Sequence, residues 1–457
     1  MKSPARPFLV GIVIASFLLA ILLAVLALRW MGAQVRVDEL SRLAAESQPI
    51  VPSDLAESTD PRPEPTAWFG ELVAARVRFE PSDIAHAERF AEFQAQAAAG
   101  DLGSDARDAF ARLEACASAD AAAAIQRVLD VVAARDGIVD VPPCGAEAAH
   151  LLGLGVAKQV EIARRAQQFG PVSPRVVAET LDRTGALFPT LPVPQGLALG
   201  EALSIEVVRA LWNDRPELVP DLLRAQRDFT RIFDSMPLLV SAYVAIDSDL
   251  RLLRSLEFAL SRLPRDTDLR WLEAELDSIR PRARLAVACV GERAFGNSAY
   301  EKMRGGAAPS GVRGIVLPTT LTISYDQAAF LRSWRERIAR LGDVAHERGP
   351  EPRFGAIEAK LAPVARAITG SSENILALAD ELEARLLLAR AALLAFRTDA
   401  QKLLDFVAKT SDPYDGRPIR VGFSENGITT LWSVGRDGSD DGGLDETRDI
   451  VWRFRPR

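Results

Sequence analysis

The chain begins with an uncharged apolar run, FLVGIVIASFLLAILLAVLAL, that extends from Phe8 to Leu28. A helix needs about 20 apolar residues to cross the hydrocarbon core of a bilayer, and this run is long enough. Basic residues precede the run, and Arg29 with Trp30 closes it, a pattern typical of a membrane interface. The run therefore predicts a single-pass transmembrane helix.

A cleaved signal peptide is the alternative, because residues 25–27 (Val-Leu-Ala) resemble a small-residue cleavage site. The apolar run exceeds the ~7–15 residues typical of such peptides, which favours an uncleaved anchor. Arg29, Arg36 and Arg42 follow the run, so the positive-inside rule does not favour a cytoplasmic N-terminus. Our interpretation is nevertheless a short cytoplasmic tail, a bacterial-type inner-membrane anchor and a large extracytoplasmic body.

The composition predicts a mainly α-helical protein. The chain has 457 residues, of which 48% are hydrophobic and only 7% aromatic, and Ala, Leu and Arg dominate its middle. This length allows two or more domains with sizeable cores. The net charge is -7 and the arginines alternate with acids, which argues against a nucleic-acid partner.

Changes in composition divide the chain into four parts. Residues 1–32 form the tail and anchor, and residues 33–68 form a juxtamembrane helix followed by a proline-rich linker. Residues 69–409 form a helical body, in which the glycine-rich stretch 303–314 is interpreted as a connecting loop or, alternatively, as a boundary between sub-domains. Residues 410–457 form a C-terminal tail.

Apolar residues recur at helical spacing through the body, and short proline-containing loops predict antiparallel neighbours. No fixed repeat period is present, so the pattern does not indicate a solenoid. The predicted helices cover 81–99, 145–170, 173–188, 247–263, 266–279, 326–347, 353–368 and 371–409.

The cysteines allow two interpretations. Cys116 and Cys144 are close enough in sequence to form a bridge if the body is exported, and Cys289 would then be left over. Alternatively, all three are small buried apolar residues. Both interpretations stay open from the sequence.

The last 48 residues have the pattern of a small antiparallel sheet. Strand-like runs occupy 419–423, 428–434 and 449–454, and an Asn-Gly turn joins the first two. An acidic, glycine-rich loop, GRDGSDDGGLDETR, lies between the second and third strands. The predicted fold is thus an N-terminal transmembrane helix, a multi-helix body and a C-terminal β-element.

Clustered carboxylates make this loop a candidate calcium site. Ca²⁺ prefers six to eight hard oxygen ligands, and glycines let the backbone turn tightly around the ion. Without a cation the carboxylates would repel one another. A solvated loop without metal is the simpler alternative. The acids concerned are Asp437, Asp440, Asp441, Asp445 and Asp449.

The helix-loop-helix calcium motif fits only the start of the loop. Asp437, Ser439 and Asp441 occupy its first three ligand positions, but the twelfth, which needs a bidentate acid, is Arg448. The flanking segments read as strands, not helices. A calcium loop within a β-element is therefore the preferred interpretation.

The tail resembles the C-terminal segment of the major pseudopilins of type II secretion. Three motifs carry the resemblance: DPYDGRP at 412–418, SVGRDG at 433–438 and DIVW at 449–452. In that family a turn of the first kind leads into a short sheet that holds a calcium ion. The resemblance covers about a tenth of the chain.

The resemblance implies the Val434 carbonyl, Asp437 and Asp449 as calcium ligands, and Asp440 and Asp441 are added on chemical grounds alone. The N-terminus departs from the family, since the apolar run contains no acid and some 380 residues separate it from the sheet. The chain is therefore not expected to be a pilin subunit.

No catalytic residue is predicted. His86, His150 and His346 each lie in a helical pattern without a second His or Cys at ligand spacing, and no nucleotide-binding or nucleophile motif occurs. Glu292 and Arg293, within GERAFG, are interpreted as a buried pair that braces helices; the alternative is a polar cleft.

These observations predict a non-enzymatic, membrane-tethered protein that makes protein contacts in the cell envelope, for example in a secretion assembly. The alternative function is an exported hydrolase with its cleft within residues 81–370.

Overall fold

A computed structural model describes most of the chain, with side chains from residue 22 onward. The described ranges, apart from short pieces between them, are 5–55, 103–117, 121–133, 141–173, 193–234, 236–305, 322–348, 373–398, 400–443 and 448–455. This part is mainly helical and carries one small antiparallel sheet, as predicted. The predicted helices 81–99 and 173–188, most of 353–368 and most of the boundary 303–314 lie outside it.

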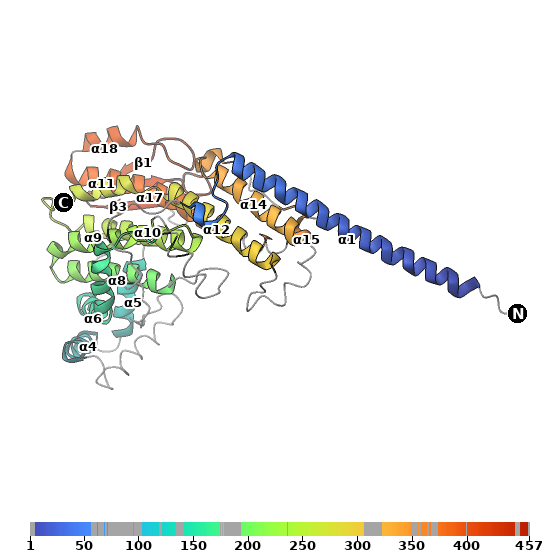
Figure 1. Cartoon of the computed structure of the whole chain (residues 1–457). Coiled ribbons are helices and arrows are strands. Elements are labelled where there is room, and N and C mark those ends of the chain that lie inside the picture. Colours follow the sequence, from blue (N-terminus) through green and yellow to red (C-terminus); the bar gives the residue numbers. More distant parts are fainter. Residues whose placement is uncertain are drawn as a thin grey trace.

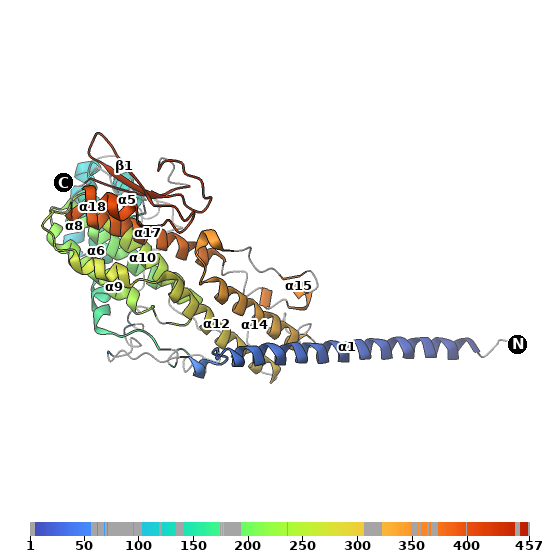
Figure 2. The same cartoon turned by 90° about the horizontal axis from the view of Figure 1, so that it is seen from above.

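A single long helix, α1, spans Ala5–Ala45. We had predicted an anchor and a separate juxtamembrane helix, but the two are continuous. Gly32 lies within the helix and against α14 (Ile323–Arg340), where an added Cβ would be 3.0 Å from the Tyr325 nitrogen. The N-terminal part of α1 projects from the body, and its C-terminal part lies along α14 (Figures 1 and 2).

In the described part of the chain, no helix combines the length and the apolar character that crossing a membrane requires. Most of the run from Phe8 to Leu28 precedes residue 22, where the description of side chains begins.

The remaining helices form the body. They are α4 (Gly103–Ala117), α5 (Ala121–Ala133), α6 (Gly145–Arg164), α8 (Val193–Trp212), α9 (Val219–Arg231), α10 (Leu239–Leu260), α11 (Arg270–Ser278), α12 (Pro281–Arg304), α15 (Glu358–Leu361), α17 (Glu373–Arg397) and α18 (Ala400–Val407). Short 3-10 turns cover Pro52–Asp54, Arg165–Gln168, Pro216–Leu218 and Ala345–Glu347.

Helix α10 lies at the centre of the body and packs against α8, α9, α12 and α17. From α8 the packing continues to α6, which contacts α4 and α5, and from α12 it continues to α14 and then to α1 (Figure 1). Because α10 contacts both α8 and α12, almost all of its side chains are buried, and those of Leu252, Leu253 and Leu256 are fully buried. Helix α1 and the C-terminal sheet thus attach to one continuous core.

Several predicted helix boundaries are wrong; for example, the helices predicted to end at 170 and 347 end at Arg164 and Arg340. Helix α10 begins at Leu239, well before the aspartates near 247 that we expected to start it. The predicted helix 371–409 is two helices, because α17 ends at Arg397 and α18 begins at Ala400. Thr398 lies at this break, where its hydroxyl donates to the Leu394 carbonyl at 2.7 Å.

The GERAFG segment of α12 is a close-packing site between helices. A Cβ on Gly291 would lie 2.0 Å from the Pro237 carbonyl oxygen, and one on Gly296 would lie 2.3 Å from the Phe330 ring. Neither position has room for a side chain. The glycines therefore allow α12 to approach both the start of α10 and the middle of α14.

Glu292 and Arg293 do not pair with each other, contrary to our interpretation. The Leu239 N–H, at the start of α10, donates to Glu292 Oε1 at 2.9 Å. Arg293 points to the segment after α1, where it donates to Gln48 Oε1 at 3.0 Å and to the Pro49 carbonyl at 3.2 Å. Adjacent residues of α12 thus hold two different parts of the chain.

Polar contacts fix the end of α1 to the body. Asn297 donates to the Ile50 carbonyl at 3.0 Å, and Arg335 donates to Glu39 Oε1 at 2.6 Å. Arg36 pairs with Glu301 at 2.9 Å. The first residues of the predicted linker are therefore packed against α12, so the helix that leaves the body is rigidly held at its base.

We predict a pH-dependent stability from Glu292. Burial raises the pKa of Glu292 to about 7, although the Leu239 N–H acts in the opposite direction. The neutral acid is the favoured folded form, so its stabilisation is complete below pH 4.5 and is lost as the pH rises through 7. Glu292→Gln keeps the acceptor and removes the charge. Because the side chain is partly exposed, we expect the variant to be more stable than the parent at pH 8 by about 1–2 kcal/mol.

Thermal unfolding of both proteins between pH 4.5 and 8 checks this expectation, since other acids titrate equally in both. Glu347→Gln, at a mostly exposed side chain, serves as the control. A Glu292→Gln protein that is less stable than the parent at pH 8 would contradict the assignment.

The C-terminal sheet matches the prediction. Strands β1 (Arg420–Phe423), β2 (Thr429–Ser433) and β3 (Ile450–Phe454) pair antiparallel in the order β1-β2-β3. The first turn closes with a bond from the Ser424 N–H to the Ile428 carbonyl at 2.9 Å, and Gly427 has a φ of +73°. The Asn-Gly signal therefore identified a real hairpin.

The sheet is held against the body by packing and by hydrogen bonds from its edge strand, β3, and the residue after it. Strands β2 and β3 pack against α17, and β3 also contacts α10. The Arg453 N–H donates to Glu257 Oε1 of α10 at 2.7 Å, and the Arg455 N–H donates to the Ser261 hydroxyl at 3.2 Å. These bonds cover an edge that would otherwise be open to pairing with another strand.

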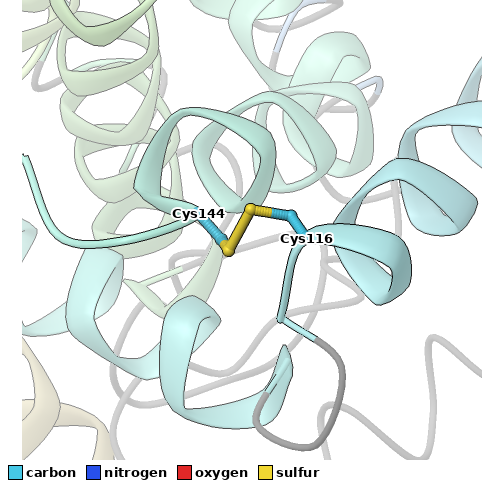
Figure 3. Close-up of a disulfide and its surroundings, with 2 residues drawn as sticks. All are labelled: Cys116 and Cys144. Atoms are coloured by element: carbon cyan, nitrogen blue, oxygen red, sulfur yellow. A yellow bond between two sulfur atoms is a disulfide. The ribbon is translucent and has the colours of Figure 1, made fainter.

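Cys116 and Cys144 form a disulfide with a Cα–Cα separation of 5.9 Å. The bond joins the end of α4 to the residue that precedes α6 (Figure 3). Cys289 is a buried free thiol in α12, and burial raises its pKa to about 12. Cys116 and Cys144 therefore follow the first interpretation, a disulfide bridge. Cys289 follows the second, a small buried residue.

Candidate metal site in the C-terminal loop

Asp412 is the fully buried carboxylate that holds the tail together. Its Oδ1 accepts bonds from the Tyr414 N–H at 2.9 Å and the Ser433 hydroxyl at 2.8 Å. Its Oδ2 accepts bonds from the Val434 N–H at 3.0 Å and from Arg420 Nη1 at 2.7 Å. The Asp-Pro turn, the first strand and the end of the second strand therefore meet at one side chain.

This bonding fixes the point at which the acidic loop begins. Val434 is fully buried, and Gly435 follows with a φ of +66°. A Cβ on Gly435 would lie 2.0 Å from the Arg448 carbonyl oxygen, so only glycine fits where the two ends of the loop touch. The loop is closed at its base, with β2 on one side and β3 on the other.

Asp437 and Asp440 are each bonded within the tail. Asp437 Oδ1 accepts the Ser439 N–H at 3.0 Å. Asp440 Oδ1 accepts the Trp432 indole N–H at 2.9 Å, and its Oδ2 lies 3.4 Å from Arg420 Nε. The bond from Trp432 is the main cause that lowers the pKa of Asp440. Both carboxylates therefore have hydrogen-bond partners within the tail.

Asp441 and Asp449 differ, because each has a buried oxygen without a hydrogen-bond partner among the described residues. Asp449 is 2% exposed; its Oδ2 accepts the Gly443 N–H at 2.9 Å, but Oδ1 is unpartnered. Asp441 Oδ2 is also unpartnered and lies 3.8 Å from an Arg448 nitrogen, too far for a hydrogen bond.

Electrostatics indicate that these acids lie close together. Burial raises the pKa of Asp449, and the negative charges of Asp440 and Asp441 raise it further, while the N–H groups of Gly443 and Asp441 oppose the shift. A buried carboxylate that lacks a partner and faces like charge is destabilised. A cation bound to Asp449 and Asp441 would relieve both costs.

The described residues offer a cation at most two carboxylates with an unpartnered oxygen in this loop, those of Asp441 and Asp449. Within the described ranges, no three His, Cys, Asp or Glu side chains converge as a metal-binding group. The remaining oxygens that Ca²⁺ needs would come from backbone carbonyls such as that of Val434 and from water. Asp445 lies in 444–447, outside the described residues. The flanking strands agree with a β-element rather than a helix-loop-helix motif.

Sequence reasoning missed the residues that position this loop. From the sequence, Asp412 is only one residue of a turn, although the pattern of Asp-Pro followed by Gly and Pro could have indicated its structural role. Glu257 of α10 and Ser261, which follows that helix, had no signal, because their partners lie almost 200 positions away. His346, assigned to a helical pattern, lies 3.1 Å from the Pro413 carbonyl oxygen and so contacts the same turn from the body.

Comparison with protein-family models, with curated proteins and with solved structures finds no match to this chain.

Proposed function

We propose that this chain is a membrane-tethered, extracytoplasmic protein whose helical body and calcium-stiffened tail mediate protein contacts in a bacterial-type cell envelope. The observation that carries the proposal is the shape of α1. Its 41 residues would extend about 60 Å at 1.5 Å per residue, and its apolar first part projects from the body. A bilayer core is about 30 Å thick, so this part is long enough to span one while the rest stays docked.

The disulfide supports the same placement. Disulfides persist in oxidising compartments such as the periplasm and are rare in the cytosol. Cys116 and Cys144 are bridged, and the body that they stabilise is continuous with the base of α1 through α6, α8, α10 and α12. The body and the bridge would therefore lie together on the extracytoplasmic side.

Fractionation of cells that express the full chain tests the anchor. We expect the protein to remain in the membrane after extraction at alkaline pH, and protease added to spheroplasts to digest the body. Release into the soluble fraction, or a body that resists protease until the membrane is broken, would overturn the proposal.

The hydrolase alternative required a cleft lined by carboxylates with raised pKa values. The pocket between α1, α12 and α14 has no carboxylate among its lining residues. Glu292, Asp249 and Glu383, whose pKa values burial raises, do not line it. No observation in the described part of the chain favours the hydrolase.

Calcium is expected to protect the tail through Asp449. At a hundredfold excess over its dissociation constant, an ion that binds only the folded tail stabilises it by about 2.7 kcal/mol. We expect millimolar Ca²⁺ to slow proteolysis and hydrogen exchange of residues 410–455, and Asp449→Asn to abolish the effect. Asp437→Asn is the matched control, because Asp437 is bonded to the Ser439 N–H.

Equal protection of the parent and the Asp449→Asn protein, or no protection at all, would remove the calcium site. Loss of protection in Asp437→Asn as well would restore the larger ligand set that the resemblance implies.

A further inference from the structure

A cavity of about 430 Å³ lies where α1 meets the end of α12 and the start of α14. Helix α1 contributes Leu28, Arg29, Gly32 and Ala33, at the end of the apolar run and just after it. The lining residues are Leu28, Arg29, Gly32, Ala33, Met303, Arg304, Ile323, Ser324 and Tyr325. The cavity therefore combines an apolar wall with hydroxyl and guanidinium groups.

The charge around the cavity is positive. Arg29 and Arg304 line it without a carboxylate. Arg304 forms an ion pair with Glu301 at 3.0 Å, and Arg36 forms a second ion pair with the same carboxylate at 2.9 Å. Arg29 is exposed and makes no ion pair with the residues that the structure describes. Arg304 thus shares its carboxylate with Arg36, and Arg29 has none among the described residues, which leaves an excess of positive charge for an anion.

The start of α14 lies beside the cavity, and the acid of its first turn, Asp326, is fully buried and accepts bonds from the Tyr300 hydroxyl and the Ala365 N–H. Thr322 precedes the helix, but its side chain forms no capping hydrogen bond. The first N–H groups of the helix therefore lack a side-chain cap. Ser324 and Tyr325 of this first turn line the cavity. Gly32 allows α1 to approach the Tyr325 nitrogen closely. A helix start beside arginines suits a phosphate group.

We propose that this cavity binds a phosphate group, and that its source is the headgroup of an anionic phospholipid. The proposal rests on α1 being a membrane anchor, because only then does the cavity lie at the interface where headgroups are found. Leu28, Met303 and Ile323 supply the apolar surface that the first part of an acyl chain would contact. Bidentate contacts from arginine suit phosphate oxygens.

Native mass spectrometry of the full chain in detergent tests the proposal. The probes are dioctanoyl phosphatidylglycerol, dioctanoylglycerol, which lacks the phosphate, and inorganic phosphate, which lacks the chains. We expect one phosphatidylglycerol per chain, and at least about tenfold weaker binding by the Arg29→Gln/Arg304→Gln variant. Ala33→Leu, which fills the cavity but keeps both charges, should weaken binding similarly. Arg265→Gln, at an exposed site outside the cavity, is the control and should bind as the parent does.

Phosphatidylglycerol that binds more tightly than inorganic phosphate, and that depends on the two arginines, would support the lipid source. Inorganic phosphate that binds equally well with the same dependence would support the phosphate site but overturn the lipid source. Unchanged binding in both cavity variants, or equal binding of dioctanoylglycerol, would overturn the site. The anchor is tested separately, because the double variant should fractionate with the membrane as the parent does.

Discussion

Replacing Asp412 with alanine is expected to unfold the C-terminal tail while the helical body stays folded. Removing one partner of a buried, hydrogen-bonded charge pair costs about 3–5 kcal/mol, because the other charge stays buried without compensation. Here the substitution leaves Arg420 and the donors of Tyr414, Ser433 and Val434 without their acceptor. Asp412→Asn should also destabilise the tail, because its NH₂ group would face donors.

Hydrogen exchange of residues 410–455 measures this effect directly, and it does not require the whole chain to unfold in a single transition. Glu425→Ala, at an exposed position in the hairpin turn, is the matched control and should leave exchange unchanged. Native exchange rates in Asp412→Ala would mean that Asp412 does not hold the tail together.

Loss of the disulfide is expected to destabilise the part of the body formed by α4, α5 and α6. The two cysteines are 28 positions apart, and closing a loop of this length stabilises a folded state by about 3–4 kcal/mol in the chain-entropy model. The Cys116→Ser/Cys144→Ser variant should therefore be cleaved by protease within residues 103–164 much faster than the parent.

Cys289→Ala is the control for the serine variant, because it removes a thiol but keeps the bridge. Reduction of the parent with dithiothreitol should reproduce the behaviour of the serine variant. If the reduced and oxidised proteins resist protease equally, the bridge contributes little to the stability of these helices.

The C-terminal sheet could be predicted from the sequence because its signals are local. The alternating runs around the Asn-Gly turn set the strands. The continuity of α1 could not be predicted in this way. Its second half packs against α14, which lies far along the chain and leaves no local signal in the sequence.

The aspartate-rich loop could be predicted from the sequence as the candidate site, but its individual ligands could not. The aspartate cluster identified the loop, yet spacing could not distinguish Asp440, which is bonded to Trp432, from Asp449, which has an unpartnered oxygen. The same limit applies to Glu292 and Arg293. Adjacent in sequence, they point to α10 and to Gln48, respectively, because neighbours on a helix do not face each other.

The claim that the body lies outside the cytoplasm is tested most directly by the redox state of its cysteines in cells. Cells are quenched with acid, and the denatured protein is treated with a maleimide of known mass before and after reduction. The chain has three cysteines, so we expect one label before reduction, on Cys289, and three afterwards. Three labels without reductant would mean that Cys116 and Cys144 are free thiols in the cell, and would contradict an oxidising location for the body.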